Sequence, residues 1–108
     1  MLVRQGTAYR NLGKLDQADA TFKKALALLP RYPLAVASLV RLDLQRKNPA
    51  GALRWAKMLV AMQANRGGNQ LLLGDAYAAS GRTAEARQAW QRAKQYGNPT
   101  ARARLSGK

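Results

Sequence analysis

The residues that could perform catalysis or bind a metal are few and scattered along the chain. The sequence contains no histidine and no cysteine, which excludes imidazole bases, thiol nucleophiles and Cys/His metal sites. No serine lies in a nucleophile-elbow context, and no glycine-rich phosphate loop is present. The acidic residues form no site-like pair, which argues against carboxylate-pair catalysis and against Mg²⁺ or Ca²⁺ binding; they are Asp16, Asp19, Asp43, Asp75 and Glu85. We therefore expect a protein that is not an enzyme and that uses no cofactor and no metal.

Arginine and lysine are the abundant chemical groups. They number 19 against 5 acidic residues in a chain of 108, which gives a formal net charge of +14. A field of that size attracts nucleic acid, anionic surfaces or acidic proteins. The basic residues are spread along the whole chain, and the Arg- and Ala-rich composition is also typical of GC-rich bacterial genomes. Charge alone therefore does not choose among these partners.

An internal repeat organises the elements that carry these groups. Six residues recur at a displacement of 68, which is twice 34. The first copy holds Gly6, Ala8, Tyr9, Gly13, Ala18 and Ala25, and the last holds Gly74, Ala76, Tyr77, Gly81, Ala86 and Ala93. Phe22 is matched by Trp90 in the same register, so small residues are expected to face large aromatic ones across each pair of helices.

The middle copy is degenerate. Val40, Asp43, Lys47 and Ala56 stand where the outer copies have glycine, tyrosine, glycine and an aromatic residue. We interpret Val40 and Ala56 as an exchange of volume across the helix pair. Asp43 is expected to weaken the local packing unless Arg41, Arg46 or Lys47 pairs with it.

Apolar spacing and capping signals predict seven helices and no strand. Their expected ranges are about 1–12, 16–29, 33–46, 49–63, 68–80, 83–96 and 99–106. Asn48 and Asn98, each followed by proline, predict helix N-caps. Asp16 and Thr83 are further N-cap candidates by residue type.

The first copy resembles the tetratricopeptide repeat (TPR) family, whose unit is a 34-residue helix-turn-helix. The matching residues are Gly6, Tyr9, Gly13, Ala18, Phe22, Ala25 and Pro30. The resemblance implies an all-α solenoid of antiparallel helix pairs, formed by a single domain over residues 1–108. We expect repeats at about 1–32, 33–66 and 67–98 and a capping helix at about 99–106. Because the first residue falls inside the standard unit, we also expect a piece of a longer solenoid.

The resemblance further implies a non-catalytic interaction module that binds a peptide or helix in a concave groove. In the family the first helix of each pair lines that groove. The positions that follow by register are Arg4, Thr7, Arg10, Asn11, Leu34, Ser38, Arg41, Gln45, Leu71, Leu72 and Asp75. This mixture of arginine and leucine suits a partner protein or peptide with acidic and apolar residues. Some members clamp a C-terminal carboxylate, but the corresponding positions here are Val3, Thr7, Ser38, Gly68 and Leu72, so that partner is not expected.

The sequence is also compatible with other partners. The chain could instead stack on further TPR repeats of a longer parent. A basic adaptor for nucleic acid or an anionic surface is the less favoured alternative, because no concentrated basic run or base-reading module is present. No apolar run is long enough for a transmembrane segment, so we expect a soluble chain, cytoplasmic rather than periplasmic.

Overall fold

Seven α-helices and no strand make up residues 2–106, which are the part of the chain that the computed structural model describes. They are α1 (Leu2–Asn11), α2 (Leu15–Leu28), α3 (Pro33–Gln45), α4 (Pro49–Met62), α5 (Gly67–Ala79), α6 (Thr83–Gln95) and α7 (Pro99–Leu105). Each helix lies within one residue of its predicted bounds. The all-α fold expected from the sequence is confirmed.

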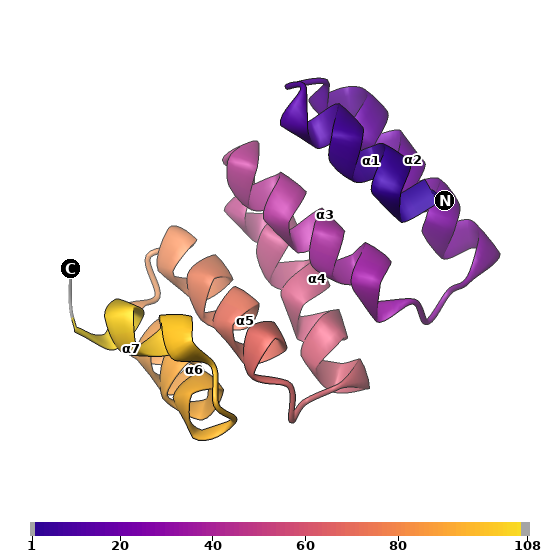
Figure 1. The fold of residues 1–108 in the computed structure, drawn as a ribbon. Coiled ribbons are helices and arrows are strands. Elements are labelled where there is room, and N and C mark those ends of the chain that lie inside the picture. The colour runs from indigo at the N-terminus through magenta and orange to yellow at the C-terminus, as the bar shows by residue number, and fades with distance from the viewer. Residues whose placement is uncertain (1, 107–108) are drawn as a thin grey trace.

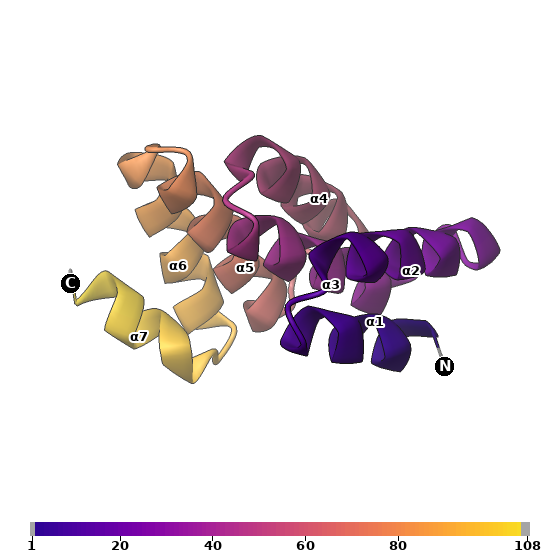
Figure 2. The same cartoon turned by 90° about the horizontal axis from the view of Figure 1, so that it is seen from above.

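The helices form three pairs that stack in chain order, with α7 against the last pair (Figure 1). The first helices of the pairs also touch one another, since α3 contacts both α1 and α5. Within residues 2–106, no comparable contact joins α2 to α4 or α4 to α6. Helices α1, α3 and α5 therefore form the tighter, inner wall of the stack, and Figure 2 shows the pairs from above.

The turns inside the pairs share one backbone geometry. Gly13, Lys47 and Gly81 all have positive φ, at 80°, 59° and 78°. The N–H of the following residue donates to the carbonyl five residues earlier in each turn, for example from Lys14 to Tyr9. This left-handed ending of a helix favours glycine, because glycine has no Cβ to clash. Lys47 adopts it without that advantage.

The second helix of each pair begins directly after this turn. Asn48 caps α4 by accepting a hydrogen bond from the Gly51 N–H at 3.3 Å, as predicted. Asn98 caps α7 in the same way, accepting from the N–H groups of Thr100 and Ala101 at 3.0 and 3.1 Å. Both capping predictions are confirmed.

The other two capping predictions are wrong. Helix α2 begins at Leu15 with Lys14 at the cap, so Asp16 lies inside the first turn. Helix α6 begins at Thr83 with Arg82 at the cap. Neither cap makes a side-chain hydrogen bond. The cap lies two residues before Asp16 in α2 and one residue before Thr83 in α6, because the preceding turn sets the start of each helix.

The small-against-large packing rule holds in both outer pairs. A Cβ added to Gly6 would overlap the ring of Phe22, and one added to Gly74 would overlap the indole of Trp90. In the middle pair Val40 and Ala56 are both fully buried in one core cluster, which fits the predicted exchange of volume.

Asp43 remains unpaired in the middle pair. Its side chain is buried against Gly51 in the first turn of α4, and none of the expected basic residues forms an ion pair with it in the described residues. Arg46 instead approaches Asp19 and Asp16 on α2, at 3.5 and 3.8 Å. Burial raises the pKa of the Asp43 carboxyl above its ordinary value, although the nearby Arg46 charge opposes the shift.

Candidate binding groove

The inner wall carries a hollow of about 370 Å³ between α3 and the start of α5. Its lining residues are Tyr32, Pro33, Leu34, Ala37, Arg41, Gln63, Arg66 and Asn69. Helix α3 begins at Pro33, because proline suits the first position of a helix. Two arginines and no carboxylate line the hollow, which we call the basic hollow.

The basic hollow concentrates positive charge. Burial and the neighbouring charge of Arg10 lower the pKa of the Arg41 guanidinium below its ordinary value, although arginine stays charged at neutral pH. Four of the five acidic side chains pair with basic residues elsewhere; those pairs involve Asp16, Asp19, Asp75 and Glu85. Within residues 2–106, no ion pair with a carboxylate involves Arg10 or Arg41, and an anionic group placed there would relieve their repulsion.

The structure exposes part of the set that sequence assigned to the groove. Arg4, Asn11, Leu34, Arg41 and Gln45 are exposed, and Thr7, Arg10 and Leu71 are half-buried; of these, Leu34 and Arg41 lie in the basic hollow. Ser38 and Leu72 are buried instead. The Ser38 hydroxyl donates to the Leu34 carbonyl at 2.9 Å, and Leu72 belongs to the central core cluster. Both therefore present almost no surface to a ligand.

Asp75 serves a different purpose from the one assigned to it. Its carboxylate accepts a hydrogen bond from the Trp90 indole at 3.0 Å and two from the Arg104 guanidinium, at 2.9 and 3.2 Å. The charge-assisted bonds hold α7 against the last pair, and the pKa of Arg104 is raised by its hydrogen bond to Asp75. The Asp75 carboxylate is thus engaged by Trp90 and Arg104 within the folded chain.

Sequence reasoning missed most residues that line the basic hollow. Tyr32 and Arg66 come from the loops before α3 and α5, which a reading of helix faces alone does not consider. Ala37 was detectable, because it lies 34 residues after Val3 in the repeat register. The repeat spacing, applied to loops as well as helices, is the signal that could have found them.

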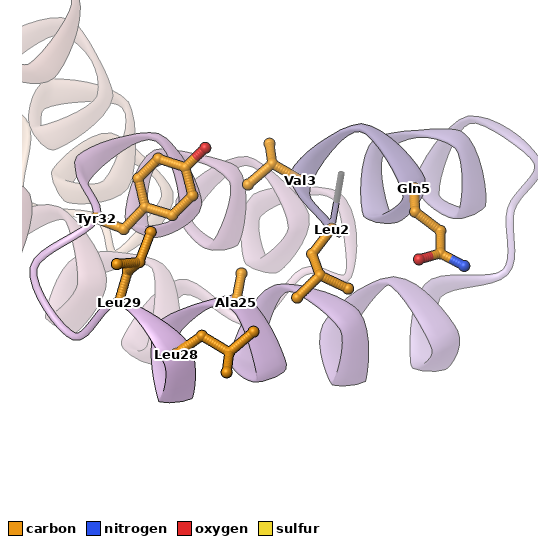
Figure 3. Close-up of a pocket in the computed structure, with 7 residues that line it drawn as sticks. All are labelled: Leu2, Val3, Gln5, Ala25, Leu28, Leu29 and Tyr32. Carbon is orange, nitrogen blue, oxygen red and sulfur yellow. The ribbon is translucent and has the colours of Figure 1, made fainter.

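A second hollow, of about 340 Å³, opens between α1 and α2 (Figure 3). Its lining residues are Leu2, Val3, Gln5, Ala25, Leu28, Leu29 and Tyr32. Leu28 and Leu29 are 68% and 57% exposed, so large apolar groups face solvent at its rim. No charged residue lines it. We call it the apolar hollow.

Within residues 2–106, no helix is both long and apolar enough to cross a bilayer. The same part of the chain contains no cluster of three or more acidic side chains that could hold a metal ion.

Comparison with known proteins agrees with the repeat register. Tetratricopeptide repeat family models match residues 1–32 and residues 69–99. The chain belongs to the tetratricopeptide repeat family. A search of curated proteins returned no match.

Solved TPR structures share this fold along almost the whole chain. The first TPR of Spaghetti (RPAP3), bound to the HSP90 peptide SRMEEVD, has a TM-score of 0.90 and 22% identity; the match covers 97% of this chain and 85% of that one. The Sgt2 TPR domain from Aspergillus fumigatus has a TM-score of 0.91 and 16% identity, with 97% and 72% covered. MamA from Desulfovibrio magneticus RS-1 has a TM-score of 0.86 and 26% identity, with 96% and 60% covered.

Proposed function

We propose that this TPR chain is a non-catalytic protein-interaction module that binds an acidic segment of a partner protein along its inner wall. The observation that carries the proposal is the basic hollow, which Arg41 and Arg66 both line. Arg10 contributes a third positive charge close enough to act on Arg41. Arginine offers a rigid fork of donors that suits carboxylates. Leu34, which is 52% exposed in the same hollow, adds apolar contact area.

The fold neighbours support this class of function. RPAP3 binds a peptide, SRMEEVD, that is rich in acidic residues. The carboxylate-clamp positions of the family hold Val3, Thr7, Ser38, Gly68 and Leu72 here, and two of these side chains are buried. We therefore propose that this chain recognises acidic side chains within a segment rather than a terminal carboxylate.

The test compares neutralisation of inner and outer charges. The inner variant is Arg41→Gln with Arg66→Gln, and the matched outer variant is Arg87→Gln with Lys94→Gln, on exposed positions of α6. Arg92 is unsuitable as an outer control because its guanidinium bonds the buried Gln70 amide at 3.0 Å. Both variants lower the net charge equally, so long-range attraction changes by the same amount.

The probes are a fluorescent peptide of alternating glutamate and leucine and a labelled single-stranded oligonucleotide, each titrated at about 50 and about 200 mM salt. The inner variant should weaken peptide binding at least about tenfold, while the outer variant should change it less than about twofold. Equal losses, together with tighter oligonucleotide binding that falls steeply with salt, would show that overall charge drives binding and that the nucleic-acid alternative is correct.

A further inference from the structure

The apolar hollow and the basic hollow share three positions of the repeat register. Val3, Leu29 and Tyr32 line the first, and the residues 34 positions later, Ala37, Gln63 and Arg66, line the second. The two hollows therefore overlap at three repeat positions, while their other lining residues have no counterpart in one another. At two of the three positions the side chain becomes more polar, from leucine to glutamine and from tyrosine to arginine.

The two hollows are also adjacent. Tyr32 lines both of them, since it lies in the loop that leads from α2 into α3. Helices α1 and α3 are in contact, and packed neighbouring helices have axes about 8–10 Å apart. An extended chain advances about 3.3 Å per residue, so a segment crossing the wall would place side chains about three residues apart in the two hollows.

The occupant of the apolar hollow follows from charge as well as shape. A second copy of this chain would bring another +14 charge against the same basic wall, which disfavours self-association. A segment that carries a carboxylate is instead attracted to the wall by the positive charges of Arg41 and Arg66 in the basic hollow. Leu28 and Leu29 expose apolar surface that only an apolar side chain would desolvate favourably.

We infer that the partner segment of the proposed function carries a large apolar side chain, such as leucine or phenylalanine, about three residues from an acidic side chain. The apolar residue enters the hollow between α1 and α2, beside Tyr32. The acidic residue meets Arg41 and Arg66 in the basic hollow. This inference rests on the proposed function and specifies the chemistry and spacing of its ligand.

The experiment selects binders from a phage-displayed library of short randomised peptides on three forms of the protein. The first is the wild type, and the second is Leu28→Ser with Leu29→Ser. The third is a matched control, Leu12→Ser with Met58→Ser, which removes two exposed apolar side chains, 71% and 42% exposed, that line neither hollow. Affinities of the selected peptides are then measured by fluorescence anisotropy.

Peptides selected on the wild type and on the control should share an apolar and an acidic residue at a fixed separation of about three residues. The Leu28/Leu29 variant should bind those peptides at least about tenfold more weakly, and its own selection should retain the acid and lose the apolar residue. Circular dichroism of all three forms checks that the helices are intact.

Two results would overturn the inference in distinguishable ways. Acidic peptides without a fixed apolar position, or equal losses in the Leu28/Leu29 variant and the control, would remove the apolar anchor and leave the proposed function standing. Failure to select any peptide on the wild type would overturn both, because the inner wall would then not be a peptide-binding surface.

Discussion

The first and last helix pairs pack by the same rule but end the stack differently. In both, a glycine of the first helix lies against an aromatic ring of the second, Gly6 against Phe22 and Gly74 against Trp90. Phe22 is fully buried and has no polar atom, whereas the Trp90 indole N–H must find a partner and finds Asp75. The same carboxylate anchors α7. Replacing phenylalanine by tryptophan is thus coupled to a polar network that holds the terminal helix.

Alanine substitution of the two glycines should produce the largest effect. Each new Cβ overlaps the facing ring, and at Gly74 relief of the overlap also moves Trp90 away from Asp75. We expect Gly74→Ala to lower the free energy of unfolding by about 2–3 kcal/mol and Gly6→Ala by about 1–2 kcal/mol, despite the better helix propensity of alanine. Urea denaturation measures both. An equal or smaller loss at Gly74 would mean that Trp90 yields without losing its hydrogen bond.

The polar network should matter only in the last pair. Asp75→Ala leaves the Trp90 N–H and the Arg104 guanidinium without their acceptor, so we expect a loss of about 2 kcal/mol and faster amide exchange in α7. Thr7 occupies the equivalent position in the first pair, and Thr7→Ala should cost less than about 0.5 kcal/mol. Hydrogen exchange followed by NMR distinguishes the two variants, and comparable losses would contradict the comparison.

The middle pair extends the comparison to the turns. Lys47 has the left-handed backbone that Gly13 and Gly81 adopt in the outer pairs, at a cost that glycine avoids. Lys47→Gly should therefore stabilise the protein by about 1 kcal/mol, seen as a higher thermal midpoint. Gly13→Lys should have the opposite sign. A stabilising effect of Gly13→Lys would show that the turn does not decide these energies.

Asp43 gives the middle pair a pH dependence of its own. Its pKa is higher in the folded chain than in the unfolded one, so the folded state retains the proton more strongly and stability falls as pH rises through that interval. Asp43→Asn should stabilise by roughly 0.5–1 kcal/mol at about pH 7, and the gain should vanish below about pH 3, where aspartate is protonated in both states. Thermal melts across pH test this, and a gain that persists in acid would point to packing instead.

The smallest loss expected within the polar network of the last pair is at its exposed end. The Arg104 side chain is 40% exposed, so its ion pair with Asp75 is screened by solvent. Arg104→Gln should cost about 0.5 kcal/mol, much less than Asp75→Ala, because Trp90 keeps its acceptor. The salt dependence of the thermal midpoint should also shrink. A loss as large as that of Asp75→Ala would assign the network's stability to α7 rather than to Trp90.

Sequence predicted the fold well because its signals are local and periodic. Helix bounds follow from apolar spacing, and Asn48 and Asn98 cap as their types suggest. The capping predictions at Asp16 and Thr83 were wrong because they relied on residue type and not on the repeat register. Lys14 and Arg82, the observed caps, lie 34 residues before and after Asn48, which caps the second helix of the middle pair.

The exposed surface of the inner wall was predicted less completely than the fold, because it depends on contacts between distant segments. Asp75 is engaged by Arg104, which lies 29 residues later on a separate helix. Ser38 turns back to its own helix by bonding the Leu34 carbonyl. Arg66 reaches the basic hollow from a loop, which helical periodicity does not describe. Tertiary packing therefore decided which polar groups remained available.

The turn at Lys47 keeps the backbone of the repeat where the residue types have changed. The family models matched residues 1–32 and 69–99 and passed over the copy between them. Yet residues 13, 47 and 81 share one left-handed backbone, and the N–H after each closes the same hydrogen bond. In the middle copy the residue types differ from those of the outer copies, whereas the backbone of the turn is the same. Glycine is therefore not required for this turn to form, and the helix pair of the middle copy is closed in the same way as its neighbours.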